Sequence, residues 1–279
     1  SLESIKKIRK LGCQNNKNYL ERLIVVKADL RNYECLKNVF ENAKADNRPF
    51  DGVMHLAGLK SASESVDHPL HYWDSNLLGS INLFKIMESY KCKTIIFSSS
   101  ASIYGLSDAT PFKEESIINP ISPYGNTKHV IEKLLGDLFV SSPNSWKIAC
   151  LRYFNPIGAH PSGEIGEDPN DKPNNIFPLL IKVAQKKIRH FEIYGNDWPT
   201  VDGTPIRDYI HIMDLAKAHL LAFEFLEKNE NQYIAMNIGT GKGTSVLELI
   251  NIFQKENQVK IPYIFSDRRK GDSAIVYAD

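Results

Sequence analysis

The sequence contains no long hydrophobic run and no excess of charge of either sign. Its longest uninterrupted apolar run is the five residues 274–278, whereas a helix needs about 20 apolar residues to cross a bilayer. The 34 Lys and Arg residues are balanced by 33 Asp and Glu residues, which leaves a net charge of +1. A nearly neutral chain has no electrostatic feature that would hold it on a nucleic acid or a membrane surface. We therefore expect neither among its partners.

The sequence also lacks paired cysteines, a secretory leader and a metal-binding pattern. No C-x-x-C pair occurs, which argues against a disulfide framework and favours a reduced compartment; the four cysteines are Cys13, Cys35, Cys92 and Cys150. Residues 1–7 are charged and hold no apolar segment, so they do not form a secretory signal. His68 and His71 have no cysteine or carboxylate at metal-ligand spacing. We predict a cytoplasmic protein without a metal site.

Short apolar runs alternate with longer amphipathic stretches over the first two thirds of the chain. The runs are rich in Ile, Val, Leu or Phe and predict buried strands, at residues 23–28, 52–56, 94–97 and 147–151. The stretches between them predict helices, at residues 33–43, 70–90 and 123–140. Strands that alternate with helices build a parallel sheet, which binds ligands at the carboxyl ends of its strands. We predict an α/β fold with a Rossmann-like, doubly wound parallel sheet.

The composition changes near residue 158, where a stretch rich in Gly, Pro, Asn and Asp predicts an ordered loop. Helices and strands follow in mixed order, with helices at 176–186, 212–226 and 246–255 and strands at 191–194 and 234–238. The segment 239–243 lacks the G-x-x-x-x-G-K-[ST] frame of a phosphate loop, so we interpret it as a turn. We predict an incomplete sheet domain at residues 1–157. Residues 158–279 would mainly form a smaller mixed α/β lobe, incomplete at its C-terminus, with segments that return to the first domain.

A Y-x-x-x-K pattern at Tyr124 and Lys128 is the first candidate for chemistry. With 12 tyrosines in 279 residues, about one such pair is expected by chance, and a second copy, Tyr33 with Lys37, reads as a solvated helix face. Context separates the two copies. Tyr124 follows Ser122-Pro123, an N-cap residue and a proline at the first helical position.

The position of Tyr124 in the first turn of its helix predicts a role in proton transfer. The positive end of the helix dipole favours a phenolate, and Lys128 lies on the same helix face and adds a positive charge. Both effects would lower the pKa of Tyr124 and suit it to act as a general base and acid. Ser100 ends a predicted strand and opens onto the same edge of the sheet. We predict Ser100, Tyr124 and Lys128 as the catalytic group.

These residues and several further segments resemble the extended short-chain dehydrogenases/reductases and, within them, the UDP-glucose 4-epimerases. The matching segments run in order over nearly the whole chain, at residues 55–60, 98–105, 122–128, 151–163, 166–169, 173–175, 194–197, 202–204, 207–211 and 268–272. So many spaced matches are highly specific. The resemblance implies a tightly held NAD, a UDP-sugar substrate and a homodimer.

The resemblance also implies a reaction and a set of binding residues. Tyr124, with Ser100, would take the proton of the sugar 4-hydroxyl while hydride passes from C4 to the nicotinamide. The 4-keto sugar would then turn and receive the hydride on its other face, which interconverts UDP-galactose and UDP-glucose. Cofactor contacts are implied for Asp29, Leu30, Leu56, Ala57, Gly58, Lys60, Ser75, Asn76, Ser100, Tyr124, Lys128 and Phe154, with Asp29 and Leu30 flanking the adenine and Asn76, Lys128 and Phe154 nearer the nicotinamide half. Substrate contacts are implied for Ser100, Tyr124, Asn155, Asn175, Ile193, Tyr194, Arg207, Arg269, Asp272 and Val276.

Two positions depart from relatives or vary among them. Ser75 stands where many relatives carry Asn, which weakens its implied contact. Val276 stands where some relatives carry a bulky Tyr and others a Cys, so a small side chain would leave room for a 2-acetamido group. This predicts activity on UDP-GlcNAc and UDP-GalNAc, while the alternative is that Val276 is only a strand residue.

One feature of the family is missing. No G-x-x-G-x-x-G turn, which would present backbone N–H groups to the cofactor pyrophosphate, lies near the N-terminus. We therefore expect that the first two strands of the sheet are absent, that both ends are truncated, and that the chain folds poorly and binds NAD weakly or not at all. The alternatives are an inactive binding fragment or a nucleotide-sugar 4,6-dehydratase. The dehydratases place an Asp-Glu pair where this chain has Ala101-Ser102, which argues against them.

Overall fold

The computed structural model describes residues 2–15, 23–106, 110–142, 145–167, 175–269 and 271–279. Its central sheet is parallel, with the strand order β1-β2-β3-β7. These strands are β1 (Val53–His55), β2 (Thr94–Ser100), β3 (Lys147–Tyr153) and β7 (Tyr233–Ile238). The predicted α/β class, with a parallel sheet and a smaller mixed part, is confirmed.

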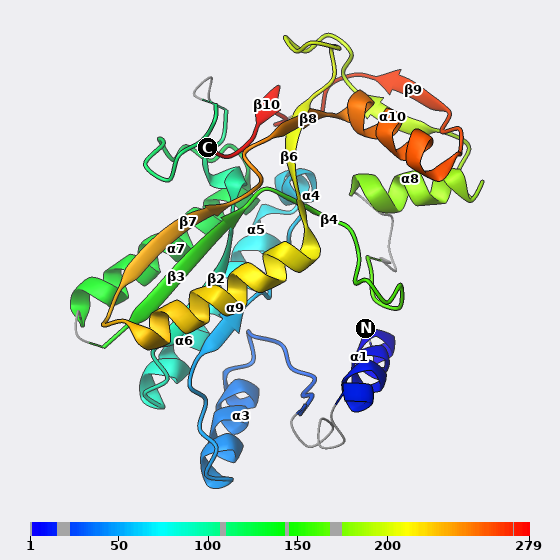
Figure 1. Ribbon diagram of the computed structural model, residues 1–279. Helices are drawn as coiled ribbons and strands as arrows, with labels where there is room; N and C mark the ends of the chain where they lie inside the picture. Colours follow the sequence, from blue (N-terminus) through cyan, green and yellow to red (C-terminus); the bar gives the residue numbers. More distant parts are fainter. Residues whose placement is uncertain (1, 16–22, 107–109, 143–144, 168–174, 270) are drawn as a thin grey trace.

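The side chains of the central strands alternate between two cores. Ile95 and Phe97 pack with Ile131 and Leu135, which belong to α7 (Pro123–Ser141). Ile96 points the other way and packs with residues of α9 (Ile212–Lys228). Helices α6 (Gly79–Ser89) and α7 therefore cover one face of the sheet and α9 covers the other (Figure 1). Because both faces are buried, β2 reads as an apolar run and not as an alternating pattern.

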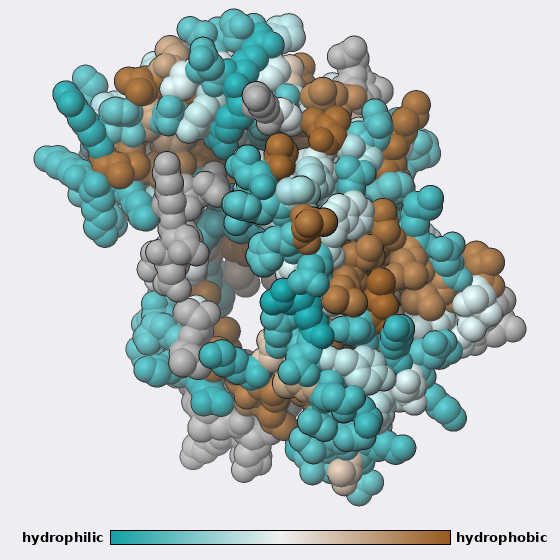
Figure 2. All heavy atoms as spheres, turned by 180° about the vertical axis from the view of Figure 1, so that it is seen from behind, coloured by the Kyte–Doolittle hydropathy of each residue, from teal (hydrophilic) through white to brown (hydrophobic). Residues whose placement is uncertain are grey.

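The strand expected at residues 23–28 does not form, and this prediction is wrong. The segment has no regular secondary structure, and Ile24 and Val26 are 68% and 52% exposed. An Ile- and Val-rich segment becomes a strand only where a neighbour supplies backbone hydrogen bonds. Strand β1 lies at the edge of the sheet, the segment 23–28 leads into α3 (Tyr33–Ala45) (Figure 1), and the space-filling view shows an opening through the molecule (Figure 2).

The helix expected at residues 70–90 is present but is not a regular α-helix. It begins as α5 (Pro69–Tyr72), widens into a π-helix, η1 (Trp73–Leu78), and continues as α6. Short π-helical turns occur often at functional sites. Two further helices were not expected from the sequence, α1 (Leu2–Asn15) and α4 (Ala62–Asp67). Helix α1 lies away from the sheet (Figure 1).

The later part of the chain forms two smaller sheets. One contains β10 (Ile275–Val276), β6 (Ile206–His211), β4 (Asn155–Ile157) and β8 (Gly243–Ser245), and the other pairs β5 (Phe191–Tyr194) with β9 (Tyr263–Ser266). Helices α8 (Ile176–Ala184) and α10 (Val246–Asn257) pack on this second pair. Since β7 and α9 lie on the central sheet, the chain crosses between the two parts more than once. The domain division at residue 157 stays a prediction. None of the helices in the described ranges is long and apolar enough to span a bilayer.

A buried carboxylate fixes the turn at residues 239–243. Asp208, which is fully buried in β6, accepts hydrogen bonds from the backbone N–H of Thr240 (2.8 Å), Gly241 (3.0 Å) and Ala278 (3.2 Å). The Thr240 hydroxyl donates a further bond of 2.6 Å. The N–H groups that a phosphate loop would offer to a ligand are therefore engaged inside the protein, and the interpretation of this segment as a turn is confirmed.

Candidate active site

The three predicted catalytic residues meet at the carboxyl end of the central sheet. Ser100 is the last residue of β2, and Tyr124 and Lys128 lie in the first two turns of α7. The start of α7 is set as the sequence predicts, because the Ser122 hydroxyl accepts the backbone N–H of Gly125 at 3.1 Å and proline follows it. All three predicted residues are at most 9% exposed.

Lys128 is held by a backbone group beside Tyr124. Its Nζ donates a 2.7 Å hydrogen bond to the carbonyl oxygen of Ser98, and lies 5.9 Å from the centre of the Tyr124 ring and 4.9 Å from that of Phe97. Burial lowers the pKa of Lys128 to about 8. The ammonium group is thus charged at neutral pH and stands within electrostatic reach of the phenol.

The predicted lowering of the Tyr124 pKa is not found in this structure. Burial raises the pKa of Tyr124, and a hydrogen bond with the Ser100 side chain acts in the opposite direction but does not outweigh it. The loss of water around the phenolate raises the pKa of Tyr124 more than the helix N-terminus and the charge of Lys128 can lower it. The sequence shows the charges near Tyr124 but not the depth at which its ring is buried.

A polar clamp joins the loop after β1 to the catalytic helix. Asn76, in the π-helix, accepts the backbone N–H of Leu59 at 2.7 Å through Oδ1. Its Nδ2 donates to the Leu59 carbonyl and to the Thr127 hydroxyl, both at 3.1 Å. Gly58 has a φ of +152°, and a Cβ atom there would lie 3.1 Å from Asn76 Oδ1 and 3.8 Å from Lys128 Nζ. Gly58 therefore packs closely against Asn76 and Lys128, two of the residues implied for the cofactor.

The residues implied for the adenine end lie on the other side of the π-helix. The Asp29 carboxylate binds the Arg31 guanidinium at 2.7 Å, which lowers the pKa of Asp29 to about 2, and Arg31 in turn binds Asp74 at 2.6 Å. Asp74 directly precedes Ser75 and Asn76. Leu30 packs against Gly79, where an added Cβ would approach the Leu30 Cβ to 3.0 Å. These contacts place the implied adenine residues beside the helix that carries Asn76.

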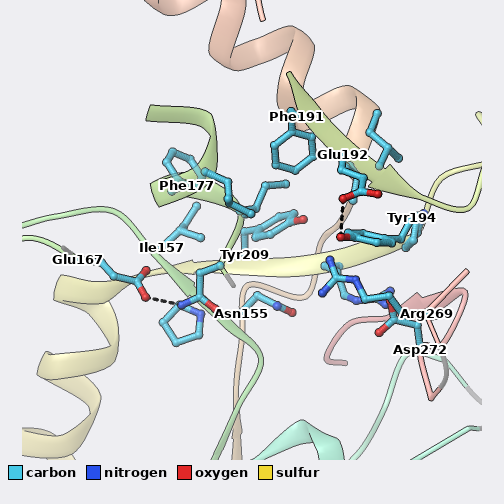
Figure 3. Close-up of a pocket in the computed structure, with 18 residues that line it drawn as sticks. Asn155, Ile157, Glu167, Phe177, Phe191, Glu192, Tyr194, Tyr209, Arg269 and Asp272 are labelled. Atoms are coloured by element: carbon cyan, nitrogen blue, oxygen red, sulfur yellow. Dashed lines mark hydrogen bonds between the residues drawn. The ribbon is translucent and has the colours of Figure 1, made fainter. Parts of the chain in front are cut away.

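Nine of the ten implied substrate residues line two adjoining cavities, whereas Tyr124 lines neither of them. The first, of about 210 Å³, and the second, of about 170 Å³, share Asn155, Arg207 and Asp272 in their walls. The first also contains the implied residues Asn175, Ile193, Tyr194 and Arg269 (Figure 3). The second also contains Ser100, Phe154 and Val276. The two cavities therefore lead from the arginines to the catalytic serine.

Positive charge is concentrated where the cavities meet. Burial lowers the pKa of Arg207, and the positive charge of Arg269 acts in the same direction while Asp272 opposes it. Arg207 donates to the backbone carbonyl of Ile206 at 2.8 Å. Two guanidinium groups that repel one another gain stability when an anion neutralises them, and guanidinium groups match diphosphates in geometry.

Several lining residues were not predicted from the sequence. Tyr153 lines the second cavity, donates a hydrogen bond to the Ser98 hydroxyl and has its pKa raised to about 12, mainly by burial. Glu167 lines the first cavity and binds both Lys60 (3.2 Å) and Asn175 (2.5 Å). Both lie in segments that carry the family resemblance, which was the available signal. Phe177, Glu192 and Tyr209 also line the first cavity. Of these, only Tyr209 lies in a segment that carries the resemblance, 207–211.

A Rossmann-like sheet with a serine at a strand end and Tyr-x-x-x-Lys on the next helix defines the class of the extended short-chain dehydrogenases/reductases. Within this class, the chain belongs to the NAD-dependent epimerase/dehydratase family, whose model matches residues 3–239. NAD is the cofactor of the family, as predicted.

The similar proteins narrow the class further. UDP-glucose 4-epimerase 2 of Arabidopsis thaliana is 44% identical over 278 residues, which span 100% of this chain and 77% of that protein. The crystal structure of UDP-glucose 4-epimerase from Bifidobacterium longum in complex with NAD+ and UDP has a TM-score of 0.86 and 41% identity, covering 94% of this chain and 77% of that one. The UDP-Glc/GlcNAc 4-epimerase of Campylobacter jejuni has a TM-score of 0.75 and 32% identity, covering 95% and 78%. The predicted resemblance to UDP-glucose 4-epimerases is confirmed.

Proposed function

We propose that this protein interconverts UDP-galactose and UDP-glucose through a 4-keto intermediate. The observation that carries the proposal is the continuity of the two cavities. Arg207 and Arg269 line the first cavity and are suited to bind a diphosphate. The adjoining cavity leads to Ser100 and its hydrogen-bonded partner Tyr124. The similarity to UDP-glucose 4-epimerases at 44% identity supports the same substrates.

The side chains divide the chemistry among them. NAD, when bound, supplies the group that accepts the hydrogen and electron pair from the sugar C4 and later returns them; Gly58, Asn76 and Lys128 would hold its nicotinamide end. Tyr124 accepts the proton of the 4-hydroxyl as general base and gives it back as general acid. Ser100 hydrogen-bonds to the Tyr124 phenol and steadies the oxygen that exchanges the proton. Lys128, charged below a pKa of about 8, favours the phenolate electrostatically.

The test is turnover of UDP-galactose, read as formation of UDP-glucose. We expect Tyr124→Phe to lower kcat by about 10²- to 10⁴-fold, the usual contribution of a general acid–base group. Tyr33→Phe is the matched control, because Tyr33 belongs to the second Y-x-x-x-K copy at the start of α3. Equal activity of both variants would exclude the assigned role of Tyr124. A product that has lost water would point to a dehydratase instead.

We also propose turnover of UDP-GlcNAc and UDP-GalNAc, because Val276 is the residue of β10 in the wall of the second cavity. The similar Campylobacter jejuni protein is described as a UDP-Glc/GlcNAc 4-epimerase, which supports the extension to UDP-GlcNAc. Val276→Tyr should abolish turnover of the N-acetylated sugars and spare that of UDP-galactose, and Val276→Ala is the control that keeps the space open. If Val276→Tyr leaves both activities unchanged, Val276 does not control access. The homodimer and the cytoplasmic location stay predictions from the resemblance and the composition.

A further inference from the structure

Glu192 and Tyr194 of β5 and Ser266 of β9 form a hydrogen-bonded group. This group lies next to Arg269, one of the two arginines that line the cavities. Tyr194 of β5 and Ser266 of β9 are direct partners in the parallel register. Both hydroxyls donate to the carboxylate of Glu192, the Tyr194 phenol at 2.8 Å and the Ser266 hydroxyl at 2.5 Å. The guanidinium carbon of Arg269 lies 3.9 Å from the centre of the Tyr194 ring. Figure 3 shows the carboxylate above the ring and the arginine below it.

We propose that Glu192 is a positioning residue for diphosphate binding, which fixes the Tyr194 ring as a platform for Arg269. The inference rests on the proposed function, because it assumes that Arg269 contacts the diphosphate of a UDP-sugar. Glu192 need not touch the ligand in this scheme. It acts through two contacts, its hydrogen bond to Tyr194 and the stacking of Arg269 on that ring.

The physical argument concerns orientation. The face of an aromatic ring attracts a cation, so a ring held in one orientation also holds the guanidinium above it. The long Arg side chain loses rotamer freedom when it binds an anion, and a platform that orders it beforehand reduces this loss. The phenol stays a hydrogen-bond donor at neutral pH, because burial and the bond to Glu192 both raise the pKa of Tyr194. Ser266 anchors the carboxylate from the neighbouring strand.

The charge of Glu192 has the opposite effect on an anionic ligand. A carboxylate in the wall of this cavity repels a diphosphate, so removing the charge alone should tighten binding. The two roles therefore predict different results for two substitutions. Glu192→Gln removes the charge but keeps an oxygen that accepts from Tyr194, whereas Glu192→Ala removes both the charge and the acceptor.

The experiment is calorimetric titration of the whole protein and its variants with UDP and with uridine. We expect Glu192→Ala to bind UDP about three- to tenfold more weakly than the unaltered protein, the size of an ordered cation–ring contact. Glu192→Gln should bind UDP at least as tightly as the unaltered protein. Uridine, which has no phosphate for Arg269, should bind all three alike.

A second pair of variants separates positioning from general damage to the lobe. Tyr194→Phe keeps the ring and the Glu192 charge but removes the hydroxyl, so it should weaken UDP binding at least as much as Glu192→Ala does. The double variant should be no weaker than either single one, because both break the same link. The inference is overturned if Glu192→Ala binds UDP as tightly as Glu192→Gln, or if uridine binding falls by the same factor as UDP binding. If the unaltered protein binds no UDP, the proposed function itself fails.

Discussion

The catalytic corner (Ser100, Tyr124 and Lys128) and the arginine cavity (the first cavity, lined by Arg207 and Arg269) share part of their walls. Lys128 is buried in the corner, whereas Arg269 is exposed to solvent in the cavity. Lys128 is 4% exposed and Tyr124 is 9% exposed, and the chief influence on the pKa of each is the loss of water. Arg269 is exposed at the rim of its cavity and stacks on a partly exposed tyrosine. Proton transfer depends on a pKa near the working pH; burial brings the pKa of Lys128 toward that range but raises the pKa of Tyr124 away from it. Anion capture depends on charge that a ligand can reach from water.

The strongest test of this contrast is the pH dependence of stability at Lys128. Its pKa in the folded protein is about 8, against 10.5 for an unburied lysine. Between these values the unfolded chain holds a proton that the folded protein has released, so the free energy of unfolding rises with pH across this window. The full rise is about 3 kcal/mol. We expect Lys128→Met to lack it, measured by urea unfolding at intervals from pH 7.5 to 10.5.

The control for this experiment is Lys133→Met, because Lys133 lies on the same helix and is exposed. The quantity to compare is the difference in unfolding free energy between each variant and the unaltered protein at each pH, which cancels groups that titrate in all of them. Parallel curves for the unaltered protein and Lys128→Met would show that Lys128 is not desolvated. The contrast between the two regions would then lose its main support.

The arginine cavity should respond to salt more than to pH. We expect Arg269→Ala to weaken UDP binding about tenfold, the size of a single charge-assisted hydrogen bond. The dependence of log Kd on log salt concentration should also become shallower, since one cation fewer meets the diphosphate. Titration with UDP at several salt concentrations measures both effects.

The neighbouring arginine offers a matched control. Arg268 is held by Asp197 at 2.7 Å, stacks on Trp198 at 4.1 Å and lines neither cavity. Arg268→Ala should therefore change neither the affinity for UDP nor its salt dependence. If both substitutions weaken binding equally, the affinity arises from the general charge of the segment and not from a placed guanidinium.

The elements that could be predicted are those in which one physical requirement, such as burial on both faces of a strand, determines which residue types occur. Strand β2 is buried on both faces, so its first residues are apolar and mark it clearly. Its last three residues, 98–100, continue the pairing with β3 but are serines, and for this reason the apolar run ended too early. The strand expected at residues 23–28 failed for the opposite reason, because strand formation depends on a partner that local sequence does not reveal.

The candidate site divides in the same way. Ser122-Pro123 indicated where α7 begins and so predicted the positions of Tyr124 and Lys128 in its first turns, because a helix cap is a local sequence signal. The direction of the Tyr124 pKa shift was missed, because it depends on how much water the folded chain excludes. The role of Glu192 could not be predicted either, since its partner Ser266 lies 74 residues away and meets it only through strand pairing.

The smallest predicted effects concern the helix caps that support each region. Ser122 caps α7 in the catalytic corner, and Ser245 caps α10 beside the arginine cavity, where Glu248 completes a capping box. Replacing either serine by alanine should cost about 1 kcal/mol of stability; Ser245 also hydrogen-bonds to Asp202, which adds to its cost.

The kinetic effects of the two substitutions should differ. Ser122→Ala should lower kcat for UDP-galactose, because α7 carries the groups that move the proton, while Ser245→Ala should mainly raise KM. Steady-state kinetics well below the unfolding temperature of both variants decides the matter, and a fall in kcat of the same size in both would mean that the two regions do not act separately.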